Sequence, residues 1–317
     1  MLVRSRRPWD VPASSITPES VYLNRRSLLA GLGAGALLVG CGAKAEEEAA
    51  IAPELYPARH NDAYTVDRPL TPEMFTTRYN NFYEFGPDKG IWQNAQALRT
   101  RPWQVVIDGL VDRPMTLDAE ELIRKMPIEE RVYRHRCVEA WSMTVPWSGF
   151  PLKALLAMVG PQAGARYVRM TTFQDPDMAS GQKQFWYPWP YVEGLTMAEA
   201  GNELTFISTG LYGKPIMKQN GAPLRLTVPW KYGFKSVKSI VHFELVAERP
   251  MGFWEALQSS EYGFWANVNP AVPHPRWSQA HERVLGTNED VPTQLYNGYG
   301  EQVAGLYAGL DKEALYM

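Results

Sequence analysis

Histidine and cysteine are scarce in this sequence, which has five histidines and two cysteines among its 317 residues. The histidines show neither H-E-x-x-H nor H-x-H spacing, and there is no C-x-x-C pair, so the sequence predicts no zinc site. A C-x-x-C-H motif is also missing, which excludes haem attached in the c-type manner to this chain. The sequence contains no G-x-S-x-G elbow, which argues against a serine hydrolase of the α/β class. It also contains no Walker loop, which argues against a P-loop nucleotide-binding protein.

Excess charge of one sign is lacking as well. The formal net charge is -2, which gives no electrostatic reason to expect a nucleic acid partner. Hydrophobic residues make up 45% and charged residues 21%, which is typical of a soluble globular chain with a sizeable core. The 11 tryptophans and 25 prolines exceed average usage and favour a loop-rich fold with aromatic-lined cavities.

No apolar run is long enough to span a bilayer. The run from Leu28 to Cys41 is too short and too rich in glycine for that purpose. It follows the paired arginines Arg25 and Arg26 and precedes an A-x-A cleavage site at residues 43–45. Residues 1–45 are therefore predicted to be a twin-arginine signal peptide, read by the twin-arginine export machinery. That machinery carries folded proteins, commonly because a cofactor is inserted in the cytoplasm.

The first cysteine has two possible fates. Residues 38–41, Leu-Val-Gly-Cys, resemble a bacterial lipobox whose cysteine becomes lipidated. Cleavage after Ala45 would remove Cys41, whereas lipidation would keep it as a membrane anchor. Both outcomes are left open, and release is favoured.

The second cysteine, Cys137, has no disulfide partner in either case. In an oxidising compartment a free thiol is a liability, so Cys137 is either buried and inert or bound to something. Arg134 and Arg136 beside it are expected to favour the thiolate form.

Strands predominate in the rest of the chain, with short helices between them. Residues 46–70 are expected to form a solvated linker and lead-in, and residues 71–317 a single domain of the α+β class with mixed sheets. The expected strands are residues 103–109, 131–137, 167–172, 224–228 and 239–245, and the expected helices are residues 117–123 and 151–159.

Three polar stretches containing glycine stand out, at residues 79–86, 219–225 and 229–238. The last two combine cationic side chains with turn glycines, an arrangement that can hold a buried phosphate without a Walker motif. The same stretches are also compatible with ordinary β-turns carrying solvated lysines. The aromatic residues 185–191 are compatible with the lining of a substrate mouth, but a structural loop is favoured, and they receive no site role.

At this point the motifs resemble a known family. Residues 137–143 and the following 145–152 resemble the molybdenum-cysteine segment of the sulfite oxidase superfamily. Within it, the chain resembles the periplasmic protein-methionine-sulfoxide reductase catalytic subunits. The stretches that carry this resemblance are residues 80–86, 210–215, 220–225, 228–236, 261–264 and 274–280.

The resemblance implies a sulfite-oxidase-like fold that binds one molybdenum ion and a single molybdopterin. Cys137 would be the molybdenum ligand, since a soft thiolate suits such a centre. Glu84 is the first candidate for the proton donor. The residues implied to hold the pterin and its phosphate are Asn80, Tyr83, Glu84, Thr172, Asn220, Arg225, Ser236, Val237 and Lys238.

The resemblance also implies a reaction and its partners. Methionine sulfoxide in oxidised periplasmic proteins would be reduced by oxygen-atom transfer to molybdenum. Electrons would come from a membrane b-type haem subunit, MsrQ, and the quinone pool, and the catalytic subunit would be monomeric. One alternative is a sulfite-oxidase-type enzyme acting on another small oxo-substrate. Another is a periplasmic lipoprotein anchored at Cys41 that binds ligands through tryptophans without catalysis.

Overall fold

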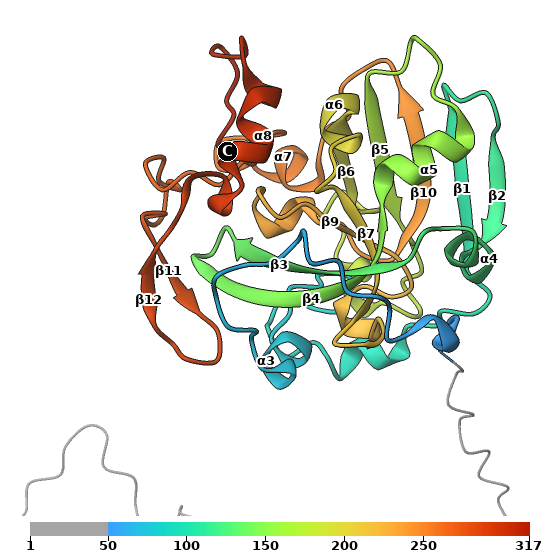
Figure 1. Ribbon diagram of the computed structural model, residues 1–317, viewed down its shortest axis with the longest axis horizontal. Helices are drawn as coiled ribbons and strands as arrows, with labels where there is room; N and C mark the ends of the chain where they lie inside the picture. The colour runs from blue at the N-terminus through green and yellow to red at the C-terminus, as the bar shows by residue number, and fades with distance from the viewer. Residues whose placement is uncertain (1–49) are drawn as a thin grey trace, which may run out of the picture. The chain divides into compact units, whose positions relative to one another are not determined.

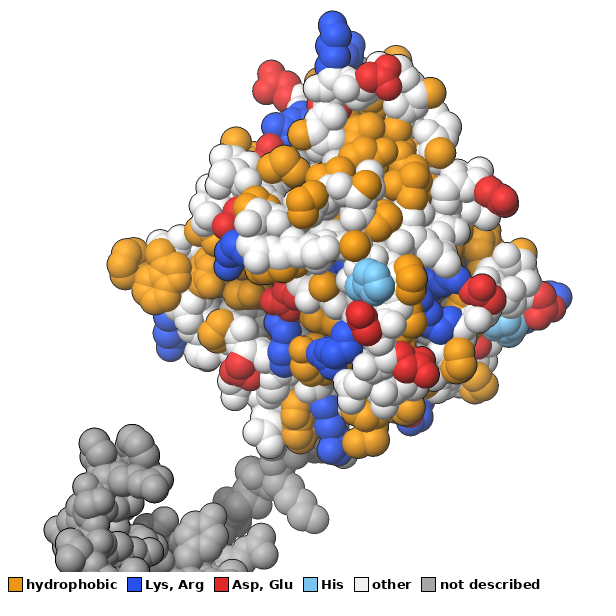
Figure 2. All heavy atoms as spheres, turned by 90° about the vertical axis from the view of Figure 1, so that its left-hand side faces the viewer, with side chains coloured by type: hydrophobic (Ala, Val, Ile, Leu, Met, Phe, Trp, Pro, Cys, Tyr) orange, Lys and Arg blue, Asp and Glu red, His pale blue; other side chains and the backbone are white. Residues whose placement is uncertain are grey.

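The computed structural model describes residues 50–317. The predicted signal peptide and Cys41 lie outside the described residues. None of the helices in the described part is long and apolar enough to cross a membrane. Figure 1 shows two β-sheets connected by short helices and long loops, and Figure 2 shows cationic and anionic side chains interspersed on one face.

The smaller sheet has five strands in the order β2-β1-β10-β5-β6. Strands β1 and β10 are parallel, and the other neighbouring pairs are antiparallel. The strand bounds are β1 Gln104–Gly109, β2 Met115–Asp118, β5 Tyr167–Thr172, β6 Val192–Thr196 and β10 Ile240–Val246.

The larger sheet has seven strands and carries the site described below. Its main order is β12-β11-β4-β7-β8, with β3 paired to β4 and β9 paired to β7. Every residue of β4 is buried, so this strand lies at the centre of the core. The bounds are β3 Glu129–Cys137, β4 Trp141–Pro151, β7 Phe206–Leu211, β8 Lys214–Pro215, β9 Arg225–Thr227, β11 His281–Val284 and β12 Asp290–Pro292.

The helices of the described part are short and capped locally. The Asp118 side chain accepts from Glu120 N at the start of α4, and Thr196 and Glu199 form a capping box at α6. The α-helices are α3 Glu73–Arg78, α4 Ala119–Arg124, α5 Leu152–Val159, α6 Met197–Ala200, α7 Phe253–Leu257 and α8 Gly300–Val303. The 3-10 helices are η2 Pro53–Leu55, η3 Asn94–Ala97, η4 Ser180–Lys183, η5 Lys218–Asn220, η6 Gly233–Lys235, η7 Leu295–Gly298 and η8 Ala304–Tyr307.

Mixed sheets with few, short helices confirm the predicted α+β class. The lead-in is not solvated throughout, as the sequence had suggested. From residue 50 onward it packs against the domain. Ile51 is buried, and the Tyr56 hydroxyl donates to Thr209 Oγ1 at 2.7 Å. Arg68 Nη1 donates to Glu282 Oε1 at 2.9 Å and so connects the lead-in with β11.

A buried ion pair fixes the loop that follows β9. Lys235 in η6 is 1% exposed and its Nζ lies 2.5 Å from Glu193 Oε2 in β6. Separating the two side chains would leave two buried charges without a partner. This contact therefore holds η6 firmly against the smaller sheet. Ser236, Val237 and Lys238 follow directly, and Val237 O accepts from Leu226 N of β9 at 2.8 Å, which places these residues beside the larger sheet.

Candidate active site and cofactor pocket

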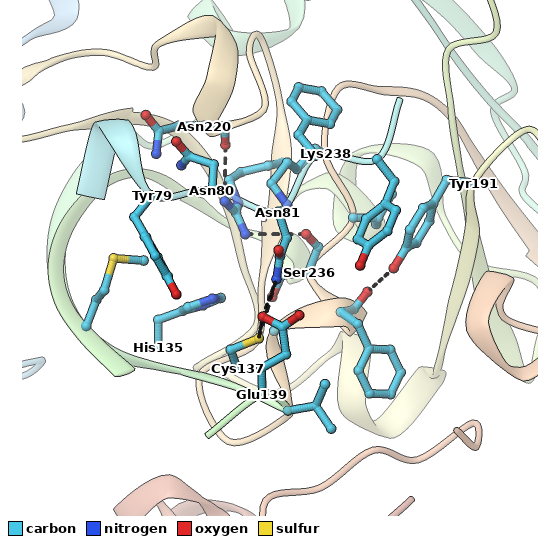
Figure 3. Close-up of a pocket in the computed structure, with 18 of the residues that line it drawn as sticks. Tyr79, Asn80, Asn81, His135, Cys137, Glu139, Tyr191, Asn220, Ser236 and Lys238 are labelled. Atoms are coloured by element: carbon cyan, nitrogen blue, oxygen red, sulfur yellow. Dashed lines mark hydrogen bonds between the residues drawn. The ribbon is translucent and has the colours of Figure 1, made fainter. Parts of the chain in front are cut away.

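One pocket collects the polar stretches that the sequence singled out. Its volume is about 880 Å³ counted out to the mouth, and it lies beside the end of β3. Figure 3 shows the side chains that converge on it. Of the predicted site residues, those that line it are Asn80, Tyr83, Glu84, Cys137, Asn220, Arg225, Ser236, Val237 and Lys238.

Cys137 is the last residue of β3 and begins the tight turn into β4. Ala140 N donates to Cys137 O at 3.1 Å, and Ala140 has a φ of 60°. Side chains alternate across a strand, so Cys137 and His135 face the pocket whereas Arg134 and Arg136 face away from it. Arg134 instead pairs with Asp67, and Arg136 Nε lies 2.9 Å from Glu282 Oε2. The two arginines therefore do not produce a thiolate in the way expected from the sequence.

The backbone of this turn is fastened from the C-terminal part of the chain. Val138 O accepts from Trp277 Nε1 at 2.7 Å and from Gln279 Nε2 at 2.8 Å. Arg136 Nη2 donates to Gln279 Oε1 at 2.8 Å, and its Nη1 donates to Cys137 O. These contacts form the turn clamp, defined as Arg136, Trp277 and Gln279, which fixes the direction in which the cysteine side chain points.

Polar groups surround the sulfur on its pocket side. Asn81 Nδ2 lies 3.5 Å from Cys137 Sγ, and Glu139 Oε2 lies 3.7 Å from it. Lys89 Nζ pairs with Glu139 Oε2 at 2.6 Å, and Trp141 Nε1 donates to the same oxygen at 3.0 Å. Burial, assisted by the charge of Glu139, raises the pKa of the Cys137 thiol to about 12. Deprotonation of Cys137 therefore requires a cation at the sulfur, as a bound metal ion would supply.

Two cationic side chains face the pocket without a carboxylate within ion-pair distance among the described residues. Arg225 is 4% exposed, and its guanidinium donates only to the backbone carbonyls of Asn220, Leu226 and Ser236, at 3.1 to 3.3 Å. Burial lowers the pKa of Arg225 to about 10. Burial and the charge of Arg225 lower the pKa of Lys238 as well. A buried anion would offset the free-energy cost of burying the charges of Arg225 and Lys238. A phosphate suits the forked guanidinium of Arg225.

Two amide oxygens in the pocket wall have no partner. Asn80 Nδ2 and Asn220 Nδ2 both donate to Thr76 O at 3.0 Å, which leaves the Oδ1 atom of each residue free. Buried acceptors of this kind are normally satisfied, so a ligand with N–H groups fits here. Together with the unpaired cations, these acceptors match a group with both ring N–H donors and a phosphate, as in molybdopterin.

Glu84 lies on the inner side of the pocket. It is 3% exposed, and burial raises the pKa of its carboxyl, while the charge of Lys238 and the hydroxyl of Thr172 oppose that shift. Thr172 thus lies behind Glu84 and does not line the pocket itself. The Tyr83 ring lies at the pocket wall, 4.9 Å from the ring of Trp254.

Sequence reasoning missed three polar residues beside the sulfur and the clamp behind it. Glu139 lies within the cysteine segment and Asn81 within the first polar stretch, but the sequence assigned neither a role. The only sequence signal for a site role was their position, because Glu139 is two residues after Cys137 and Asn81 is two residues before Tyr83. Lys89 carried no signal. Among the described residues there is no group of three or more His, Cys, Asp or Glu side chains that could hold a metal ion.

Comparison with known proteins agrees with this pocket. The model of the oxidoreductase molybdopterin binding domain matches residues 93–254. The protein-methionine-sulfoxide reductase catalytic subunit MsrP of Pseudomonas syringae pv. tomato (strain ATCC BAA-871 / DC3000) is 48% identical over 332 residues, covering 98% of each chain. Among solved structures, the sulfane dehydrogenase SoxCD from Paracoccus pantotrophus matches 60% of this chain and 50% of its own, with 15% identity and a TM-score of 0.42. The identity and coverage of the MsrP relative confirm the resemblance seen in the sequence: this chain belongs to the family of protein-methionine-sulfoxide reductase catalytic subunits, oxidoreductases with a molybdopterin-binding domain.

Proposed function

We propose that this protein reduces methionine sulfoxide residues of oxidised periplasmic proteins to methionine, using one molybdenum ion and a single molybdopterin. The observation that carries the proposal is the convergence of the Cys137 thiol with the unpaired cations Arg225 and Lys238 in one pocket. The sulfoxide reductase activity of the MsrP relative supports the choice of substrate.

The predicted site residues that line the pocket would bind the metal, the phosphate and the pterin ring. Cys137 would be the protein ligand of the metal, held in direction by the turn clamp. Arg225, Ser236 and Lys238 would bind the phosphate, and the free oxygens of Asn80 and Asn220 would accept from the pterin ring. When bound, the cofactor supplies the oxygen acceptor and the two-electron chemistry that side chains do not offer.

The overall reaction consumes two electrons and two protons and releases the sulfoxide oxygen as water. We assign proton delivery to Glu139 in preference to Glu84. Glu139 lies 3.7 Å from Cys137 Sγ, and its side chain is 32% exposed, so it faces both the inner pocket and solvent. Burial opposes ionisation of Glu139, but hydrogen bonds from Lys89 and Trp141 outweigh it and lower its pKa, so Glu139 would pass protons on as a carboxylate relay rather than hold one at rest. Glu84 is buried, and its raised pKa favours a neutral carboxyl that can donate a hydrogen bond to a bound group.

The remaining parts of the proposal concern export and electrons. The twin-arginine motif supports export of the folded protein to the periplasm. The lack of a c-type haem motif in the sequence supports electron supply from a separate subunit, the membrane b-type haem protein MsrQ, fed by quinones. The protein would act as a monomeric catalytic subunit of that system.

The test is the molybdenum content of protein exported with its own signal, measured by elemental mass spectrometry. We expect about one metal per chain, together with reduction of an oxidised protein substrate by the dye-reduced enzyme. Cys137→Ser should lose both the metal and turnover while remaining folded. A folded, exported and metal-free wild-type protein would refute the proposal, as would full turnover by the Cys137→Ser variant.

A further inference from the structure

The segment from Gln184 to Tyr191 is a loop, as expected from its sequence, but two of its large side chains are not used for packing against the domain. It contains no helix or strand and connects η4 with β6. Phe185 is 91% exposed and Trp186 is 58% exposed. Scattered apolar residues are ordinary on a protein surface, but adjacent exposed aromatic rings next to a pocket indicate a binding surface.

The exposed rings are continuous with the wall of the pocket. Phe185 and Trp186 have ring centroids 5.2 Å apart, Trp186 and Tyr187 are 6.1 Å apart, and Tyr187 and Tyr83 are 6.0 Å apart. Tyr83 and Trp254 both line the pocket that contains Cys137. An unbroken row of rings therefore leads from solvent to the candidate active site. We call Phe185, Trp186 and Tyr187 the aromatic row.

The base of the row is held in place by hydrogen bonds, one of which reaches the pocket residue Glu84. Gly181 N donates to Glu84 O at 2.8 Å, just before the segment begins. Trp189 Nε1 donates to Gln184 O at 3.2 Å and closes the loop on itself. Because the base is fixed, the exposed rings are presented at a constant place relative to the pocket mouth, which reduces the entropy lost on binding.

The chemistry of the substrate indicates what this row binds. Methionine packs mainly in apolar surroundings, and its oxidation to the sulfoxide disrupts that packing. The residues around a methionine sulfoxide that has left a core are therefore enriched in apolar side chains. We propose that the aromatic row binds the apolar neighbours of a methionine sulfoxide within a locally unfolded segment of an oxidised protein, a proposal that rests on the proposed function of the pocket.

The length of the row sets a register for the bound segment. The three steps from Phe185 to Tyr83 measure 5.2, 6.1 and 6.0 Å between ring centroids. Their sum is the longest span that the row can have, and an extended chain, which advances about 3.3 Å per residue, covers it in at most about five residues. An apolar side chain about five residues from the sulfoxide would contact Phe185 and Trp186, whereas free methionine sulfoxide would reach neither.

The experiment uses synthetic peptides with one methionine sulfoxide and either leucine or serine about five positions away on each side. With the dye-reduced enzyme, Phe185→Ala/Trp186→Ala should lower kcat/KM about tenfold for the leucine peptide. The same variant should leave kcat/KM for free methionine sulfoxide within about twofold. Leu295→Ala is the matched control, since Leu295 is 46% exposed but lies outside the row, and it should change neither value.

Peptide binding to metal-free protein, followed by fluorescence polarisation, separates this proposal from the function of the pocket. Binding that weakens about tenfold in the double variant supports the row even if no sulfoxide is turned over, in which case only the proposed function fails. Equal loss for the peptide and free methionine sulfoxide would overturn the proposal, because the variant would then act through the pocket. Unchanged peptide binding with slower reduction by the electron donor would also overturn it and assign the row to the redox partner.

Discussion

Replacement of Gly181 by alanine tests whether the pocket wall is held as tightly as the structure indicates. A Cβ at this position would lie 2.1 Å from Tyr83 O and 2.7 Å from Glu84 O. Both are backbone atoms, so neither can move aside by rotation of a side chain. To reach 3.0 Å, the gap to Tyr83 O must widen by about 0.9 Å and the gap to Glu84 O by about 0.3 Å. Overpacking of this kind costs about 1–3 kcal/mol.

The expected result for Gly181→Ala is a fall in the melting temperature of the metal-free protein of roughly 2–12 °C. Molybdenum per chain should fall as well, because Tyr83 and Glu84 are predicted to hold the cofactor. Gly305→Ala is the control, since its Cβ would meet no atom within 4 Å, and its stability should change by less than about 0.5 kcal/mol. A Gly181→Ala protein that melts like the wild type and retains its metal would refute the reasoning.

Three further outcomes follow from the site. Burial and the charges of Arg225 and Lys238 lower the pKa of His135 from 6.5 to about 3. Between pH 6.5 and pH 3, His135 is therefore neutral in the folded protein and takes up a proton when the protein unfolds. Acid titration of the metal-free protein should therefore show its free energy of unfolding falling by about 1.4 kcal/mol per pH unit as pH drops from 6.5 to 3, and His135→Gln should remove that part of the slope. Gln279→Leu leaves Val138 O with one donor fewer, and chemical denaturation should show a loss of about 1–3 kcal/mol together with less bound metal, whereas a variant with normal stability and metal would contradict the turn clamp. Glu139→Gln should keep the metal but lower kcat about 100-fold in dye-driven assays, and unchanged kcat would exclude Glu139 as the proton carrier.

Strands with one buried face could be predicted closely from the sequence. Residues 167–172 were expected as a strand and form β5 with the same bounds, because Val168, Met170 and Thr172 alternate with less buried neighbours. Strand β4 was missed for the opposite reason. All its residues are buried, so no alternation marks it, and Pro146 and Pro151 argue against a strand in sequence.

The candidate site divides in a similar way. Cys137 and the residues around Arg225 belong to short motifs whose members are close in sequence, so the sequence alone located them. Trp277 and Gln279 act on Val138 O from 139 and 141 residues away, and only the folded chain reveals those contacts. The orientation of Arg136 away from the pocket likewise depends on Glu282, which the sequence does not connect with it.

The turn clamp has a consequence for the order in which the site is made. Cys137 leaves the ribosome about 140 residues before the two side chains that hold its turn. Until Trp277 and Gln279 have been synthesised and have reached Val138 O, that carbonyl lacks both of these donors, and only contacts closer in sequence hold the turn. A chain that stops before residue 279 therefore presents an incomplete site, although every residue that lines the pocket has already been made. Stable retention of the cofactor would thus report that this distant part of the chain has folded.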